Sequence, residues 1–375
     1  MAITKDLSQS DFKVSKSIGA YLFVIFLLIY LIPFTFKNDL LSFERNGKYF
    51  ISVFFMLVVF AIVFVFIADI KTELIGINKR NSISYLLIFV LAILSAYFFS
   101  LLLGFKGLTN RDEVRSETSN FTGNSFDFIF NQLSSILVAI SSYVLSYSIW
   151  KGRLSYMFGS LAIVFLIFFY NGTRWNLLLG ISPLLIYVLI ISRLRTLIFI
   201  STVSVLVMLF ISQTRGTNKI ELASAIMWDI PSFQSKKIIN HYDGDGRIID
   251  FINGNFIVLV PRILWENKPR DETTEKYMIS EIGDRYFYGA TVLPGFLGSA
   301  YLYGGVGGVM YFTSAFCLLF GYFLYRNSKI NGPLTFAELG LFYIGFVLQI
   351  RGISIFYLMP FFFLKLIRFL FKTNV

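Results

Sequence analysis

The chain has 375 residues, of which 56% are hydrophobic and 15% are charged, with 44 phenylalanines and a mean hydropathy of +0.70. Soluble domains carry about 45–50% apolar and about 25% charged residues, so this composition excludes an ordinary soluble protein and indicates a membrane protein. The net charge of +11 fits basic loops that flank membrane spans. No basic stretch has the interleaved aromatics of a nucleic-acid groove, so nucleic acid is not an expected partner.

Apolar segments of helix length recur along the whole chain. A helix needs about 20 apolar residues to cross a hydrocarbon core of about 30 Å. We therefore expect an all-α polytopic membrane protein with about ten transmembrane helices. The predicted spans are 17–36, 50–68, 84–104, 125–149, 154–170, 175–192, 196–213, 296–324, 333–350 and 352–372.

The connections between these spans indicate how the chain is organised and oriented. Lysines and arginines are more frequent in the alternate loops that include both termini, which predicts that both termini face the cytoplasm. One connection is far longer than the others and faces outward in this orientation. The chain is thus divided into a seven-span membrane part (1–213), a large extracytoplasmic loop with short helices (214–295) and a three-span membrane part (296–375).

The large loop carries most of the chemistry outside the spans. It holds half of the acidic residues and the only histidine, His241, and long loops in compact proteins are usually functional. Its apolar stretch 248–264 is long enough for an interfacial or re-entrant helix. The single cysteine, Cys317, cannot form an intramolecular disulfide, and no Cys/His spacing suggests a metal. No metal or other cofactor is expected.

Four arginines are predicted at the outer membrane interface. Arg174 and Arg351 lie in very short outward loops, Arg215 follows a span directly, and Arg262 ends an apolar stretch of the large loop. The planar guanidinium matches phosphate oxygens, so several arginines at this depth would hold a lipid diphosphate. The alternative is that arginines at span ends simply extend to lipid headgroups.

Other side chains of the large loop and the next span complete the candidate site. A histidine imidazole is suited to general-base work near neutral pH, so His241 is a candidate base, although a lone histidine in a polar loop is also typical of a solvated surface. The alternative bases are Glu266, Glu281 and Asp284. Trp265 lies in a cationic segment with Lys268 and Arg270.

Tyrosines and glycines near the start of the predicted span 296–324, and a DGDG segment of the large loop, also indicate local structure or function. Tyr301 and Tyr303 would stack on sugar rings or belong to an interfacial aromatic belt. Asp243 and Asp245, in the sequence DGDG, indicate a turn rather than a calcium loop. Glycines around the span's start indicate close helix packing: Gly295, Gly298, Gly304, Gly305, Gly307 and Gly308.

Two segments carry a resemblance to a known family. PRILWENKPR (261–270) and TVLPGFLGSAYLYGGVGG (291–308) resemble the large outer loop and the following span entry of the Wzy-type O-antigen and polysaccharide repeat-unit polymerases. The layout of about ten spans with one large outer loop is also similar. This chain has Ser299 where many members of the family have glutamate.

The resemblance implies a GT-C-like membrane glycosyltransferase in the bacterial inner membrane, with the large loop in the periplasm. Such an enzyme polymerises undecaprenyl-diphosphate-linked repeat units into O-antigen of lipopolysaccharide or a related surface polysaccharide. Its partners would be the lipid-linked donor and acceptor glycans, the bilayer and a chain-length regulator protein. Arg215, Arg262 and His241 would then be catalytic residues, with Arg174 and Arg351 among the substrate-binding residues.

Two other functions remain open from the sequence. An O-antigen ligase shares the layout but transfers glycan to the lipid A core. A lipid-linked sugar flippase or other transporter would usually place charges or broken helices at mid-membrane. The predicted spans have few ionisable residues near their centres, which favours the enzymes over a transporter.

Overall fold

The part of the chain that a computed structural model describes is helical, apart from one short strand pair. The described residues are Tyr30, 43–67, 73–74, 124–151, 158–162, 174–191, 231–256, Trp265, Asn267, Pro269, 271–282, 294–326, 329–330 and 332–370. The strands β1 (Glu73–Leu74) and β2 (Lys329–Ile330) are parallel, with Glu73 opposite Lys329. The all-helical class predicted from the sequence is confirmed for this part.

The described helices are of two kinds. Some are long helices of the bundle, and others are short helices in the loop region. They are α3 (Phe43–Ile67), α7 (Asn124–Lys151), α9 (Arg174–Gly180), α10 (Ser182–Ile191), α13 (Pro231–His241), α14 (Ile248–Asn255), α15 (Glu272–Ile282), α16 (Gly295–Leu302), α17 (Gly305–Arg326), α18 (Pro333–Leu348) and α19 (Met359–Leu370). Two 3-10 turns, η4 (Gln349–Arg351) and η5 (Ile355–Leu358), join α18 to α19.

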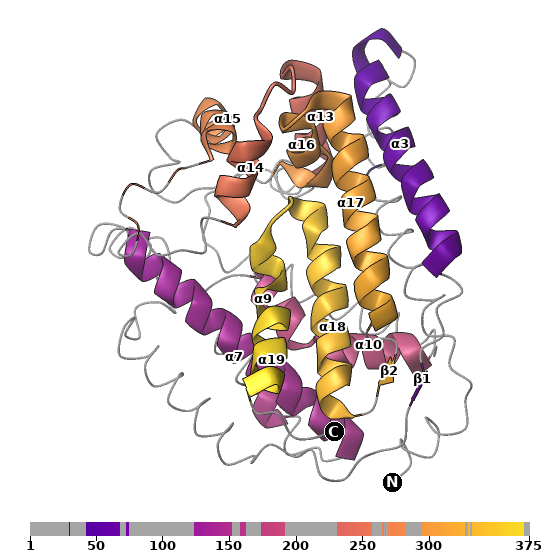
Figure 1. Cartoon of the computed structure of the whole chain (residues 1–375), viewed down its shortest axis with the longest axis vertical. Helices are drawn as coiled ribbons and strands as arrows, with labels where there is room; N and C mark the ends of the chain where they lie inside the picture. Colours follow the sequence, from indigo (N-terminus) through magenta and orange to yellow (C-terminus); the bar gives the residue numbers. More distant parts are fainter. Residues whose placement is uncertain are drawn as a thin grey trace, which may run out of the picture.

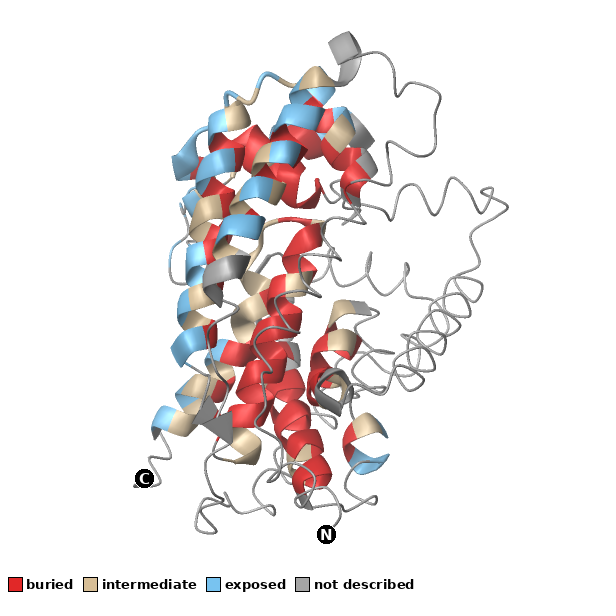
Figure 2. Ribbon diagram, turned by 90° about the vertical axis from the view of Figure 1, so that its right-hand side faces the viewer, coloured by how far each residue is buried: buried red, intermediate tan, exposed pale blue. Residues whose placement is uncertain are grey.

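The centre of the bundle is α18, which packs against α7, α9, α10 and α19, while α17 packs against α3 (Figure 1). Phenylalanines fill the space around α18: the ring centroids of Phe342 and Phe346 are 4.5 Å apart, and those of Phe342 and Phe361 are 5.3 Å apart. Figure 2 shows the buried residues as a continuous column between helices whose outer faces are exposed. Phenylalanine rings therefore form much of the described core around α18.

Within the described residues, two helices are long and apolar enough to cross a membrane, namely Gly305–Arg326 and Pro333–Arg351. The second is almost entirely enclosed by its neighbours, whereas α17 exposes one long apolar face. Leu318 is 69% exposed and Tyr325 is also 69% exposed on that face. A face of this kind on a membrane-length helix is suited to contact with lipid.

Several predicted spans correspond closely to observed helices. The spans 125–149 and 333–350 match α7 and α18 with η4 to within about two residues, and 352–372 contains η5 and α19. The span 50–68 corresponds to α3, which begins earlier, at Phe43. The spans 84–104 and 196–213, and most of 17–36 and 154–170, lie outside the described residues.

Two predicted spans are each divided into two helices in the structure. The span 175–192 is divided into α9 and α10 at Ile181, because Gly180 and the following Pro183 weaken the helical hydrogen-bond pattern. The span 296–324 is divided into α16 and α17, where Gly304 and Gly305 have φ angles of +155° and +57°. Such angles end a right-handed helix and favour glycine.

The short helices of the loop region lie together at one end of the molecule. In Figure 1, α13, α14 and α15 lie beside α16 at the end opposite the start of α18 and the end of α19.

The basic side chains Lys365 and Arg368 near the end of α19 both contact the fully buried carboxylate of Glu338, at 2.6 and 3.1 Å. The division into parts 1–213, 214–295 and 296–375 stays a prediction.

Candidate functional site

A pocket of about 360 Å³ lies where the loop-region helices meet the bundle. Its walls come from α14, α15, the start of α9, the α16 region and the turn that joins α18 to α19. The lining residues are Trp175, Gly254, Asn255, Asp271, Thr274, Met278, Pro294, Ser299, Tyr303, Gly352, Ile353, Ser354, Phe356 and Tyr357.

One wall of the pocket is a short chain of hydrogen bonds between side chains. The Tyr303 hydroxyl donates to Oδ2 of Asp271 at 2.5 Å and lies 2.6 Å from Oγ1 of Thr274. Oδ1 of Asp271 accepts from the Thr274 backbone N–H at 3.0 Å, which caps the N-terminus of α15. Burial, together with the neighbouring Asp271 charge, raises the pKa of Tyr303, which precedes α17, so its phenol remains a donor.

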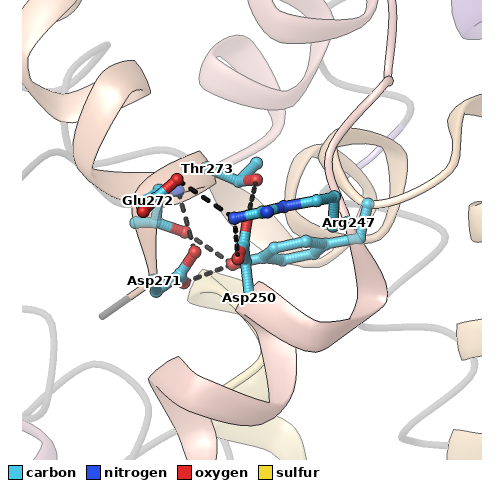
Figure 3. A network of polar contacts seen from close by, with 7 residues as sticks. Arg247, Asp250, Asp271, Glu272 and Thr273 are labelled. Carbon is cyan, nitrogen blue, oxygen red and sulfur yellow. Dashed lines mark hydrogen bonds and ion pairs between the residues drawn. The ribbon is translucent and has the colours of Figure 1, made fainter. Parts of the chain in front are cut away.

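A second network lies beside this wall and joins α14 to α15 (Figure 3). Arg247 donates to Oδ1 of Asp250 at 2.9 Å and to Oε2 of Glu272 at 3.0 Å. Thr273 also donates to Asp250, at 2.8 Å, so this buried carboxylate is fully engaged. The hydrogen bond and charge of Asp250, with the charge of Glu272, raise the pKa of Arg247. The network is therefore structural and fixes the two helices that form the pocket's outer side.

The opposite wall is the turn after α18, which is held by side-chain to backbone bonds. The Gln349 side chain donates to the Ser354 carbonyl at 2.8 Å and accepts from the Ser354 N–H at 2.7 Å. Between them, Gly352 adopts a φ of +149°. The Ile355 N–H donates to Oδ1 of Asn255 at 3.2 Å, which connects this turn to α14.

Two of the four predicted arginines are next to pocket-lining residues in the chain. Arg351 ends η4 directly before Gly352, is half-buried, and lies within electrostatic reach of Tyr357. Within the described residues its guanidinium has no ion-pair partner. Arg174 is the first residue of α9, directly before Trp175, whose ring meets Tyr357 edge-on at 5.7 Å. The Trp175–Tyr357 contact thus brings the two arginine-bearing segments to the same pocket.

The start of α16 is fixed by two hydroxyls from elsewhere in the chain. The Phe296 N–H donates to the Tyr30 hydroxyl at 2.8 Å, and the Gly298 N–H donates to Ser235 at 3.1 Å. Tyr30 also donates to the Ile350 carbonyl at 3.0 Å, which joins the start of α16 to the turn that carries Arg351. These bonds satisfy N–H groups that a helix start leaves without a partner.

The DGDG segment forms the predicted turn and docks onto the break between α16 and α17. Gly244 has a φ of +69°, and a Cβ built there would lie 2.5 Å from Cα of Gly305. The Gly246 N–H donates to the Leu302 carbonyl at 2.9 Å. Across the described residues, no group of three or more His, Cys, Asp or Glu side chains could hold a metal ion.

Close packing by glycine is confirmed at some of the predicted positions but not at all of them. A Cβ on Gly298 would lie 2.9 Å from Ile238, and one on Gly308 would lie 2.4 Å from the Ala300 carbonyl oxygen. Gly307, by contrast, has no atom within 4 Å of such a Cβ, so it does not permit any close contact.

Of the other predicted site residues, one lines the pocket, some lie elsewhere in the fold, and some fall outside the described residues. Tyr303 lines the pocket, whereas Tyr301 is buried in the core. His241 is exposed at the end of α13, where its Nδ1 donates to the Lys237 carbonyl at 2.8 Å, and it does not line the pocket. Trp265 is 43% exposed. Outside the described residues lie Arg215, Arg262, Lys268 and Arg270.

The sequence reasoning missed several pocket residues, above all Asp271, Thr274 and Trp175. Asp271 directly precedes a polar helix, and an aspartate at that place is a recognised signal for an N-cap. Trp175 follows Arg174 directly at the start of a predicted span. No local signal would have paired Asp271 with Tyr303, because the two are 32 residues apart and meet only in the fold.

Taken together, the lining suits a sugar next to a phosphate. Aromatic rings offer faces and edges to a sugar, and hydroxyls and a carboxylate accept from its hydroxyls. Arg351, which directly precedes the lining residue Gly352, would suit an anion. Comparisons with protein-family models, curated proteins and solved structures found no match to this chain.

Proposed function

We propose that this chain is a membrane glycosyltransferase of the Wzy type, which polymerises undecaprenyl-diphosphate-linked oligosaccharide repeat units at the outer face of the bacterial inner membrane. The product would be O-antigen or a related surface polysaccharide. The observation that carries this proposal is the pocket in which the Arg351 turn and the Arg174 end of α9 meet an aromatic and hydroxyl-rich wall.

In this proposal the arginines stabilise the leaving group. An acceptor hydroxyl attacks the anomeric carbon of the donor glycan, the bond to the diphosphate oxygen breaks, and undecaprenyl diphosphate departs with the electron pair. Negative charge develops on that oxygen, so fixed guanidinium groups would lower the barrier. Arg351 and Arg174 would act at the pocket, together with Arg215 and Arg262.

The acceptor proton needs a destination, and two side chains are candidates for it. His241 carries an imidazole, the side chain that most often serves as a general base, but it lies outside the pocket lining. Asp271 lines the pocket, although its two oxygens are engaged with Thr274 and Tyr303. Trp175 and Tyr357 would hold the sugar, since aromatic rings pack well on its C–H faces.

Deleting the gene and analysing the cell's glycans tests this function. A polymerase deletion leaves single repeat units on the lipid carrier or the core, and re-expression of the wild-type chain restores long polymer. Bare core with polymer still on the carrier would identify a ligase instead. Substrate trapped on the cytoplasmic side would identify a transporter. Either of these two patterns contradicts the proposal.

A further inference from the structure

Helix α14 has its polarity reversed relative to a helix on the surface of a soluble protein. Its polar residues Asp250, Asn253 and Asn255 are at most 8% exposed. Phe251 packs inward, but four other large apolar residues face outward: Ile248 is 54% exposed, Ile249 52%, Ile252 38%, and Phe256, at the C-terminal end, 54%. In water, an amphipathic helix adopts the opposite rotation, with the apolar stripe inward.

This rotation of α14 is fixed by specific bonds on its polar side. Asp250 accepts from Arg247 and Thr273, and Asn255 accepts from the Ile355 N–H of the turn after α18. Gly254 lies so close to Asp271 that a Cβ there would be 2.6 Å from Oδ2. The apolar face is therefore presented outward by the same contacts that build the pocket wall.

Inner aromatic rings connect α14 to α17, and α17 carries an exposed apolar face of its own. Phe251 of α14 contacts Phe312 with ring centroids 4.6 Å apart, and Phe312 contacts Tyr311 at 5.4 Å. Tyr311 is 61% exposed and begins a face that runs the length of α17. Other large exposed side chains of that face are Met310, Leu318, Leu319, Tyr322 and Tyr325.

We propose that α14 lies in the outer membrane interface with Ile248, Ile249, Ile252 and Phe256 in contact with lipid acyl chains. The same chain has α17, which is long and apolar enough to span the bilayer and also exposes large apolar side chains, so lipid is the occupant that we assign to this face. Arg247, with a side chain 60% exposed at the start of α14, fits the headgroup level. Insertion of α14 requires only a membrane protein and does not depend on glycosyl transfer.

Insertion would also set the depth of the pocket. Gly254 and Asn255 line the pocket from the opposite side of α14, so this helix would separate the pocket from the acyl chains. The pocket would then open at headgroup depth, where the diphosphate of a lipid-linked substrate lies. This consequence rests on the proposed function.

Site-directed fluorescence tests the insertion. Cys317 is replaced by alanine, and single cysteines are placed by Ile249→Cys and Ile252→Cys, with Lys276→Cys on the exposed surface of α15 as the matched control. Each variant carries an environment-sensitive dye in nanodiscs with and without lipid that bears a nitroxide in the upper acyl chain. We expect nitroxide quenching at both isoleucine positions to exceed that at Lys276 several-fold, and aqueous iodide to show the reverse order.

Three outcomes would overturn the proposal. Equal iodide quenching at all three positions would mean that α14 faces water. Protection of the dye from both quenchers, with a disulfide-linked dimer of the unlabelled Ile252→Cys protein, would assign the face to a second copy. The same protection without a dimer of the unlabelled protein would assign the face to another protein. Glycan polymerisation is measured separately on the same variants, so loss of the proposed function and loss of insertion are distinguishable.

Discussion

Arg351 is the side chain on which the proposed chemistry can be tested most directly within the described residues. It is half-buried and directly precedes Gly352, which lines the pocket. Replacing Arg351 with alanine is expected to lower the polymerisation rate about 10²–10³-fold, the usual effect of losing one fixed stabilising group. Glycan chain length on gels measures it, with membrane insertion checked by immunoblot.

Arg326 provides the control for Arg351→Ala. It ends α17 at the other end of the bundle and donates to Tyr322 at 3.1 Å, away from the pocket. Arg326→Ala should leave chain length unchanged. If the two variants behave alike, Arg351 has no special role in the reaction.

Arg215 and Arg262 lie outside the described residues, and their role stays a prediction from the sequence. Each change to alanine should abolish long glycan chains while the protein still inserts, because a diphosphate leaving group needs concentrated positive charge. Chain-length profiles of membranes with equal protein levels measure this. Full-length polymer from both variants would remove these two arginines from the diphosphate site.

Gly244 is a single residue whose backbone conformation supports the pocket from outside it. An alanine at its φ of +69° costs about 1–2 kcal/mol from the backbone alone. Its Cβ would also meet Gly305 at 2.5 Å, so Gly244→Ala should release the DGDG turn from the α16–α17 break. Limited proteolysis within 242–247 and a lower thermal unfolding midpoint in detergent should report this loosening.

The matched control for Gly244→Ala is Gly307→Ala. Gly307 lies inside α17 with no atom within 4 Å of a new Cβ, so alanine there should be neutral or stabilising. Equal destabilisation by the two substitutions would mean that the DGDG turn is not held by its glycine contact.

At the level of elements, the start of α16 depends on the Tyr30 hydroxyl. Tyr30→Phe leaves the Phe296 N–H and the Ile350 carbonyl without this partner in a buried place, which should cost about 1–3 kcal/mol. The unfolding midpoint measured in detergent should fall. Tyr311→Phe, at a 61% exposed ring on α17, should leave the midpoint unchanged, and an equal fall in both would contradict the capping role.

Long helices formed by uninterrupted apolar segments could be predicted from the sequence, whereas the breaks within predicted spans could not. The spans 125–149 and 333–350 match α7 and α18 because length and apolar content alone define them. The break at Gly304 and Gly305 could not be predicted from the sequence, because glycine is compatible with both a closely packed helix and a turn. Docking of Gly244 onto this point decides between the two, and only the fold shows it.

At the candidate site, position in a short loop was a usable sequence signal, whereas contacts between distant elements were not. Arg174 and Arg351 were selected from their places in short loops, and both lie next to residues that line the pocket. The Asp271–Tyr303 pair was missed because it is made by two elements that are distant in sequence. Tyr301 was selected beside Tyr303, but helical geometry turns its ring into the core.

For the whole molecule, charge and apolar surface are distributed along one axis. The Arg247–Asp250–Glu272 network and the pocket lie with α14 and α15 at one end, while Glu338, Lys365 and Arg368 form an ion cluster between α18 and α19. The exposed apolar face of α17 lies between. This arrangement fits a bundle that crosses a bilayer and carries the pocket at one interface.

The most direct measurement is polymerisation by the purified chain in liposomes that contain a lipid-diphosphate-linked oligosaccharide. The expected result is a ladder of longer lipid-linked glycans, with one lipid diphosphate released for each repeat unit added and strong loss of both in Arg351→Ala. A wild-type protein that releases no lipid diphosphate and forms no ladder, although it is folded and correctly inserted, would contradict the proposed function.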